Sequence, residues 1–156
     1  MIIKPCLLLL TMLLLSTQAS AGFDVTRMST VVDDYSGSFT TTKNGRFDDS
    51  AFVGTSFTEF ANFHMGENAD TAGLTGTISK NISRSNGYLE TVSEGSLSLI
   101  SEENALDVSF VNLSVLFDEE LTITGEITVN DEVYNFQELP PLVAAILRKI
   151  FKLTRR

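Results

Sequence analysis

Hydrophobic and polar residues alternate most regularly along residues 121–129. Apolar side chains occupy every second position, interrupted by Gly125, and threonine or glutamate fills the positions between them. A period of two places one set of side chains in a core and the other in water, which predicts a half-buried β-strand. Asn130-Asp131 suits a two-residue hairpin turn, and a β-forming segment follows at residues 132–136. The predicted register pairs Val129 with Glu132, Ile127 with Tyr134, and Gly125 with Phe136.

The preceding segment predicts the neighbouring strand. A short loop at residues 118–120 would place Phe117 opposite Leu121 and Val115 opposite Ile123. The apolar residues farther upstream have the other parity from those of residues 111–117. Because a shift of one residue turns an apolar set to the opposite face, the change predicts a bulge or bend near Phe110-Val111.

Further β segments occupy residues 23–32, 74–82 and 88–100. Asn86-Gly87 favours a turn between the last two, Glu94-Gly95 a further break, and Asn44-Gly45 another hairpin. Together these signals predict about seven to nine antiparallel strands, arranged as a β-sandwich or a small β-barrel.

Two segments depart from this pattern. Ser56 and Glu59 have the spacing of a helix capping box, and Gly66 suits a helix end, so a short helix near residues 57–65 is an alternative to a strand there. The second segment, residues 140–156, begins with Pro140-Pro141, and proline is tolerated in the first turn of a helix.

The predicted C-terminal helix is amphipathic. Large apolar residues fill about half of its circumference, and all five basic residues fall in the other half, without an acidic residue among them. A purely cationic polar side is typical of helices that lie on anionic membranes or on acidic partners. The residues predicted to make this contact are Leu142, Ile146, Leu147, Arg148, Lys149, Ile150, Phe151, Lys152, Arg155 and Arg156. A helix that simply covers a sheet would show a similar apolar face, so this alternative stays open.

The N-terminal segment has the pattern of a secretory signal peptide. Lys4 precedes a short apolar run from Leu7 to Leu15, and the small residues Ala19 and Ala21 follow. This order predicts cleavage after Ala21, and the run is too short to span a bilayer. Cleavage would also remove Cys6, the one cysteine, so we expect a secreted or periplasmic protein without disulfides. The predicted organisation is a signal peptide at residues 1–21, a β-domain at 22–139 and a cationic helix at 140–156.

Charge is distributed unevenly along the chain. Residues 22–139 contain all 20 acidic residues but five basic ones, whereas residues 140–156 contain five basic residues and no acid. Such an acidic domain would be repelled by nucleic acid. The basic tail is suited to an anionic surface.

The sequence offers little for catalysis or metal binding. His64 is the single histidine and has no cysteine partner after residue 21, which excludes ordinary zinc, copper and haem ligand sets. Paired acids recur, but neighbours on a strand point to opposite faces, and the loop at residues 66–70 offers a weak calcium pattern at most. We therefore expect no enzymatic activity, no cofactor and no metal.

Two functional hypotheses follow. The first is a non-enzymatic β-domain whose C-terminal helix attaches it to an anionic membrane surface or to an envelope protein. The second is a small β-barrel that binds an apolar ligand, with the helix as a lid or plug. They differ in whether the apolar side of the helix faces away from the protein or into it.

Overall fold

The computed structural model describes residues 22–66, 72–101, 105–118 and 120–154. The predicted signal peptide lies outside these residues. The described part contains eight strands, a short 3-10 helix η1 and one α-helix, α2. The strands are β1 (Phe23–Val32), β2 (Ser38–Asp48), β3 (Ala51–His64), β4 (Gly73–Ser85), β5 (Tyr88–Ile100), β6 (Ala105–Asp118), β7 (Glu120–Val129) and β8 (Glu132–Asn135), followed by η1 (Phe136–Glu138) and α2 (Pro141–Leu153).

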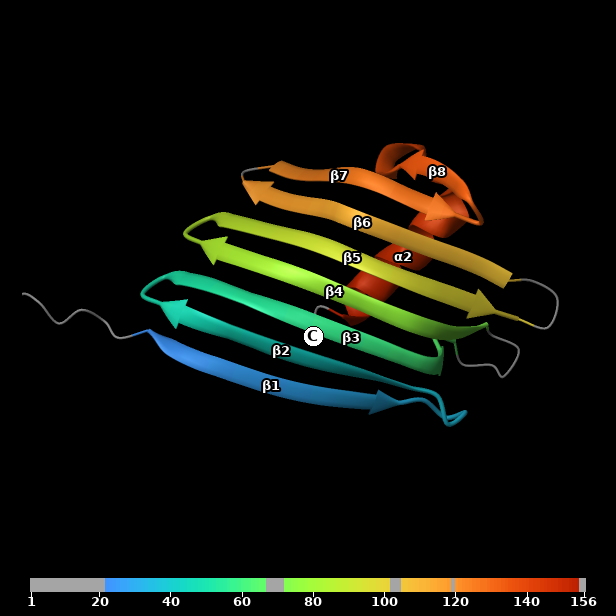
Figure 1. Ribbon diagram of the computed structural model, residues 1–156, viewed down its shortest axis with the longest axis horizontal. Coiled ribbons are helices and arrows are strands. Elements are labelled where there is room, and N and C mark those ends of the chain that lie inside the picture. Colours follow the sequence, from blue (N-terminus) through green and yellow to red (C-terminus); the bar gives the residue numbers. More distant parts are fainter. Residues whose placement is uncertain (1–21, 67–71, 102–104, 119, 155–156) are drawn as a thin grey trace, which may run out of the picture.

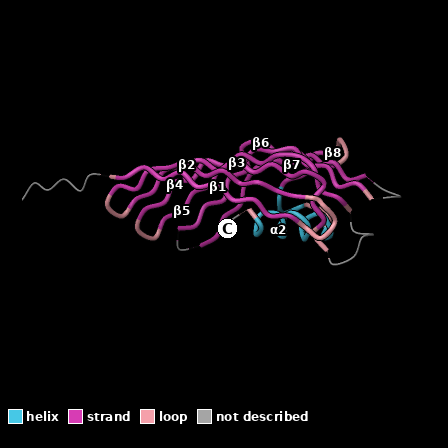
Figure 2. The backbone as a smooth tube through the Cα atoms, turned by 90° about the horizontal axis from the view of Figure 1, so that it is seen from below, coloured by secondary structure: helices cyan, strands magenta, loops and turns pink. Residues whose placement is uncertain are grey.

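The strands form one antiparallel sheet in which each strand pairs with its neighbours in sequence, from β1 at one edge to β8 at the other (Figure 1). The predicted class, a mainly β antiparallel domain with a C-terminal amphipathic helix, is confirmed. The sheet is a single open layer rather than a closed barrel or a sandwich. Figure 2 shows why one layer can hold a core: α2 lies against one face of the sheet, and the other face carries no helix.

Much of the predicted register is confirmed. Phe117 pairs with Leu121, and Val115 pairs with Ile123. In the last hairpin, Val129 pairs with Glu132 and Ile127 with Tyr134. The predicted pair of Gly125 with Phe136 is wrong, because β8 ends at Asn135 and the chain turns into η1.

The predicted bulge in β6 is present and centres on Asn112. Val111 pairs with Glu126 and Ser114 with Thr124, so two residues of β6 face the single Gly125 of β7. Asn112 has a φ of 54° and Gly125 a φ of 127°, the left-handed values that such a bulge requires. Because the extra residue follows Val111, that side chain points to the helix-free face and is 66% exposed.

Three turn and helix predictions are wrong. Asn44-Gly45 lies inside β2, and the hairpin turn forms five residues later, at Asp49-Ser50, where Asp49 has a φ of 48°. Glu94-Gly95 does not end β5, which continues past it. Residues 57–64 belong to β3 rather than to a short helix, because their backbone pairs with β2 and β4 over almost the whole length of the strand.

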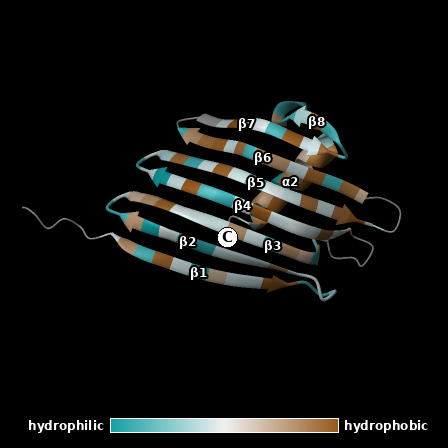
Figure 3. Ribbon diagram, in the orientation of Figure 1, coloured by the Kyte–Doolittle hydropathy of each residue, from teal (hydrophilic) through white to brown (hydrophobic). Residues whose placement is uncertain are grey.

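The hydrophobic core lies between α2 and half of the sheet. Val143, Leu147 and Ile150 are the buried residues of α2, and they pack with buried side chains from β2 to β7. Burial of such an aliphatic side chain stabilises a fold by about 1.5–3 kcal/mol. The core side chains of the sheet are Phe39, Phe60, Phe63, Leu74, Ile78, Leu97, Leu99, Val108, Phe110, Leu113, Ile127 and Val129. Alternation along the strands appears as bands of opposite hydropathy in Figure 3.

Candidate functional site

Most charged residues of the strands separate by sign between the two faces, with Arg46 of β2 and Glu132 of β8 as exceptions. The cross-strand pairs place Arg27, Lys43, Lys80 and Arg84 on the face that carries α2. In the described parts of β1 to β7, the acidic side chains occupy the opposite face, which has no helix: Asp24, Asp48, Glu59, Glu90, Glu94, Asp107, Asp118 and Glu126. The helix side of the sheet is therefore positive, although the chain as a whole is acidic.

Three of these cations share one line across the sheet. Arg27 pairs with Lys43, Lys43 with Ser56, Ser56 with Lys80, and Lys80 with Ser93. We call these five residues the basic row. Neighbouring positions of paired strands lie about 5 Å apart, so the row concentrates positive charge along a short path. It crosses the sheet beside the end of α2.

Lys80 is the buried member of the basic row, with 9% of its surface exposed. Its Nζ donates a hydrogen bond to Oγ1 of Thr154 and lies 5.1 Å from the centre of the Phe151 ring. Among the described residues, no carboxylate forms an ion pair with it. Burial, aided by the positive charge of Lys43, lowers the pKa of Lys80 to about 8. A lysine buried without an acid costs stability, which is characteristic of a functional residue.

The serines on either side of Lys80 are also unusual. Oγ of Ser56 and Oγ of Ser93 are buried, and neither atom has a hydrogen-bond partner. Buried hydroxyls in native proteins nearly always have one, and each exception calls for an explanation. Around Lys80 the basic row thus combines a buried positive charge with two buried hydroxyl groups that have no hydrogen-bond partner.

Beyond the basic row, away from the helix, lies a band of apolar side chains on the same face. Phe23, Phe47 and Phe117 are 62%, 39% and 48% exposed. Other apolar side chains that lie near them on this face, on paired strands, are half-buried. The band, which we call the apolar strip, consists of Phe23, Phe47, Phe52, Ile82, Leu89, Val115, Phe117 and Ile123.

Aromatic rings reinforce the apolar strip at its β1 to β3 end. The ring centres of Phe23 and Phe47 are 5.2 Å apart, and those of Phe47 and Phe52 are 4.7 Å apart. The Phe52 ring lies over bare backbone, since a Cβ at Gly54 would come within 2.6 Å of its Cζ. The strip therefore presents apolar side chains beyond the end of α2, interrupted by Arg84 between Phe52 and Leu89 and by Thr91 between Ile82 and Val115.

The residues predicted to contact a membrane or partner divide between the two sides of α2. Leu147 and Ile150 are buried against the sheet, whereas Ile146 and Phe151 are half-buried there. Leu142 is 72% exposed. Arg148, Lys149 and Lys152 are exposed, and Lys149 also donates a 2.6 Å hydrogen bond to the Met65 carbonyl. Arg155 and Arg156 lie outside the described residues.

His64 and Asp33 form a second polar cluster. Asp33 accepts hydrogen bonds from the backbone N–H groups of Tyr35, Gly37 and His64, and its Oδ2 is 3.1 Å from Nδ1 of His64. Burial raises the pKa of Asp33, but these hydrogen bonds outweigh it and bring the pKa to about 2. In the described chain, no hydroxyl or thiol side chain hydrogen-bonds to either residue, so the pair fastens the β1–β2 turn to the end of β3.

The described residues give no support to metal binding or to a membrane-spanning helix. No group of three or more histidine, cysteine or acidic side chains among them is placed to hold a metal ion. The described chain contains no helix with the length and apolar character needed to cross a bilayer. The weak calcium pattern falls mostly on residues 67–71, which lie outside the described part.

The basic row could not be recognised from the sequence. Its members are isolated from one another along the chain, and only strand pairing brings them together. Comparisons with protein-family models, with curated proteins and with solved structures find no match to this chain. The side chains on the two faces of the sheet are therefore the main indication of function.

Proposed function

We propose that this is a non-enzymatic secreted or periplasmic protein that attaches to an anionic membrane surface. The observation that carries the proposal is that one face of the sheet combines the basic row, Arg84 and the apolar strip, while the acidic side chains in the described parts of β1 to β7 occupy the other face. Surfaces that bind anionic bilayers peripherally combine positive charge with apolar side chains that enter the interface.

The excess of acidic residues does not prevent such attachment. Each Lys or Arg near an anionic membrane contributes about 1 kcal/mol of attraction, which decays within a Debye length of about 8 Å at physiological ionic strength. The acidic side chains in the described parts of β1 to β7 project from the far face, so they are separated from the bilayer by the sheet itself. The face that the protein turns toward the bilayer therefore decides whether the electrostatic interaction is attractive, and the net charge of the chain matters less.

The helix also contributes to this side of the protein. Its apolar side packs on the sheet, so its contribution comes from the exposed Arg148, Lys149 and Lys152, with Leu142 beside them. The apolar side of the helix thus faces into the protein, which is the orientation expected for the second hypothesis, so the proposed attachment does not involve that apolar side. The helix here serves the core and adds positive charge to the same face as the basic row.

A second copy of the chain is a weaker occupant for this face. Two copies placed face to face would bring Arg27, Lys43 and Arg84 of one against those of the other, and like charges held together are unfavourable. An anionic bilayer would attract the basic side chains and also accept the side chains of the apolar strip, so it suits this face better.

Vesicle co-sedimentation tests the proposal with the chain from Gly22, which contains every described element. Binding to vesicles with anionic phospholipid should exceed binding to zwitterionic vesicles, and it should fall as salt is added. Changing Arg148, Lys149 and Lys152 together to glutamine should weaken binding several-fold with little change in melting temperature, because all three side chains are exposed.

Two arginines on neighbouring strands provide a matched control. Arg27 lies on the helix side of β1, whereas Arg46 of β2 lies on the other face beside Asp24. Arg27→Gln should weaken binding to anionic vesicles, and Arg46→Gln should leave it nearly unchanged. Equal losses would show that net charge, rather than one face, governs attachment.

A fatty-acid uptake assay, run beside the co-sedimentation, separates attachment from the binding of a single apolar ligand, which is the second hypothesis drawn from the sequence. A carrier would take up a soluble fatty acid without vesicles and would show no preference for anionic vesicles. Uptake of that kind would replace the proposal.

A further inference from the structure

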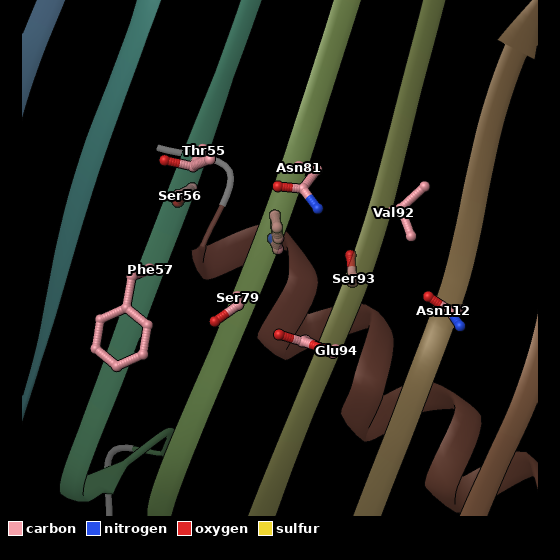
Figure 4. A pocket seen from close by; sticks show the side chains of 10 residues that line it. Thr55, Ser56, Phe57, Ser79, Asn81, Val92, Ser93, Glu94 and Asn112 are labelled. Carbon is pink, nitrogen blue, oxygen red and sulfur yellow. The ribbon is translucent and has the colours of Figure 1, made fainter.

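The helix-free face contains a hollow that the proposed membrane attachment does not use. It has a volume of about 320 Å³ and lies over the middle of β3, β4, β5 and β6. Figure 4 shows it with α2 behind the sheet, so the hollow opens on the side opposite the helix. This volume is at the lower end of the range for small-molecule sites.

The β6 bulge shapes one wall of the hollow. The left-handed backbone at Asn112, with a φ of 54°, inserts an extra residue opposite Glu94 and Gly125, and it places the Asn112 side chain at the hollow (Figure 4). Bulges commonly redirect a side chain next to a functional site. Asparagine also tolerates this conformation better than most residues.

The polar side chains of the hollow have unused hydrogen-bonding groups. Thr55, Ser79, Asn81, Glu94 and Asn112 line it, and no hydrogen bond within the described chain involves any of their side chains. Two carboxamides, two hydroxyls and one carboxylate supply both donors and acceptors within a small area. A ligand rich in hydroxyl groups would match this mixture.

An aromatic ring completes the hollow. Phe57 is 46% exposed although its neighbours Ser56 and Thr58 are buried, and Figure 4 shows its ring beside the polar side chains. The negative face of an aromatic ring attracts the weakly positive C–H groups of a flat, saturated ring. A sugar offers C–H groups on one side and hydroxyls around its edge.

We infer that this hollow binds an uncharged saccharide. Glu94 and the other acids of this face disfavour phosphates and acidic sugars by like-charge repulsion. A single carboxylate is too few for a divalent cation, and the mainly polar lining is unsuited to an apolar ligand. Ser56, Lys80 and Ser93 of the basic row also line the hollow. The Lys80 Nζ lies on the helix side, at Thr154 and the Phe151 ring, so the ligand proposed here and the bilayer would meet opposite faces of the sheet.

The test is an NMR titration of the isotope-labelled chain from Gly22 with three neutral disaccharides, maltose, lactose and diacetylchitobiose, and with glucuronic acid. At least one neutral sugar should shift the amide signals of β3 to β6 around Asn81, with a dissociation constant of about 10 mM or tighter. Absence of shifts with all three at about 20 mM, or tighter binding of glucuronic acid, would overturn the inference.

Matched variants locate the binding. Asn81→Ala should weaken it about tenfold, whereas Asn44→Ala, on the same face but outside the hollow, should not change it. Asn112→Gly removes the carboxamide and permits the positive φ, so it should weaken binding while preserving the fold. Phe57→Ala should abolish binding and Phe57→Tyr should retain it. Unchanged binding in Asn81→Ala and Phe57→Ala would place the sugar elsewhere and contradict the inference.

Discussion

The two faces of this single-layered sheet differ in how far their side chains need to be covered from water. The helix-free face carries mainly threonine, serine and acidic side chains, and its exposed apolar side chains, such as Met28, Val53 and Val111, are separated from one another by polar ones, so it needs no cover. The helix-side face is apolar on both sides of its polar middle, but α2 covers only one of these two parts. The acidic composition of the whole chain therefore reflects the helix-free face, and it does not reveal the positive charge of the helix-side face.

The helix-side face is itself divided by the basic row. On one side of the row, Leu147 and Ile150 complete a closed core. On the other side, Phe23, Phe47 and Phe117 stay partly exposed. A protein selected only for stability would extend its cover over both halves, so the uncovered half is where we expect an external surface to bind.

The largest effect should come from breaking the covered half. Leu147 is 1% exposed, and Leu147→Asp would place a carboxylate in the core without a partner. We expect a loss of about 3–5 kcal/mol in the free energy of unfolding, measured by chemical denaturation. Leu142→Asp, at a position 72% exposed, is the matched control and should cost less than about 1 kcal/mol. Similar losses in both variants would show that α2 does not pack as described.

The bulge that joins β6 to β7 should be the next most sensitive feature. Gly125 has a φ of 127°, and a Cβ there would lie 3.0 Å from the Leu113 Cα. Gly125→Ala should cost about 2–3 kcal/mol, from backbone strain together with the contact. Gly87 has a φ of 75° and open space around it, so Gly87→Ala should cost about 1 kcal/mol. Thermal melting of the two variants provides the comparison.

A smaller, pH-dependent effect should mark the basic row. The pKa of Lys80 is about 8 in the folded protein and 10.5 for an unperturbed lysine, so folding releases a proton between these values. The stability of the wild type therefore rises with pH across this window. Lys80→Met should be more stable at pH 7 by on the order of 1 kcal/mol, and this advantage should shrink between pH 8 and 10.5. An advantage that does not change with pH would contradict the uncompensated charge of Lys80.

The period-two pattern predicted the strands best where the buried face is apolar. Residues 121–129 show it, and their register with Phe117 and Tyr134 followed from it. In β3 the pattern is inverted, because Ser56 and Thr58 are buried while Phe57 is exposed. That inversion made a helix an equal alternative, and it arises because the middle of the helix-side face is polar.

Long-range strand pairing explains the remaining differences between the features predicted from the sequence and those of the structure. Asn44-Gly45 has the local signature of a turn, but Gly45 pairs with Gly54 and leaves room for the Phe52 ring. The amphipathic pattern of residues 141–153 correctly predicted a helix, yet it is the same for a helix on lipid and a helix on a sheet. The basic row and the saccharide hollow are assembled from four or five strands, so no local pattern could indicate them.

The orientation of the protein on a bilayer is the measurement that tests the account most directly. The chain from Gly22 has no cysteine, so a single environment-sensitive fluorophore can be attached through Phe47→Cys or Phe57→Cys. These positions are 39% and 46% exposed and lie on opposite faces of the sheet. On addition of anionic vesicles, the label at position 47 should shift to the blue and become protected from an aqueous quencher, while the label at 57 should not change. Protection at 57 but not at 47, or at neither position, would contradict attachment through the helix-side face.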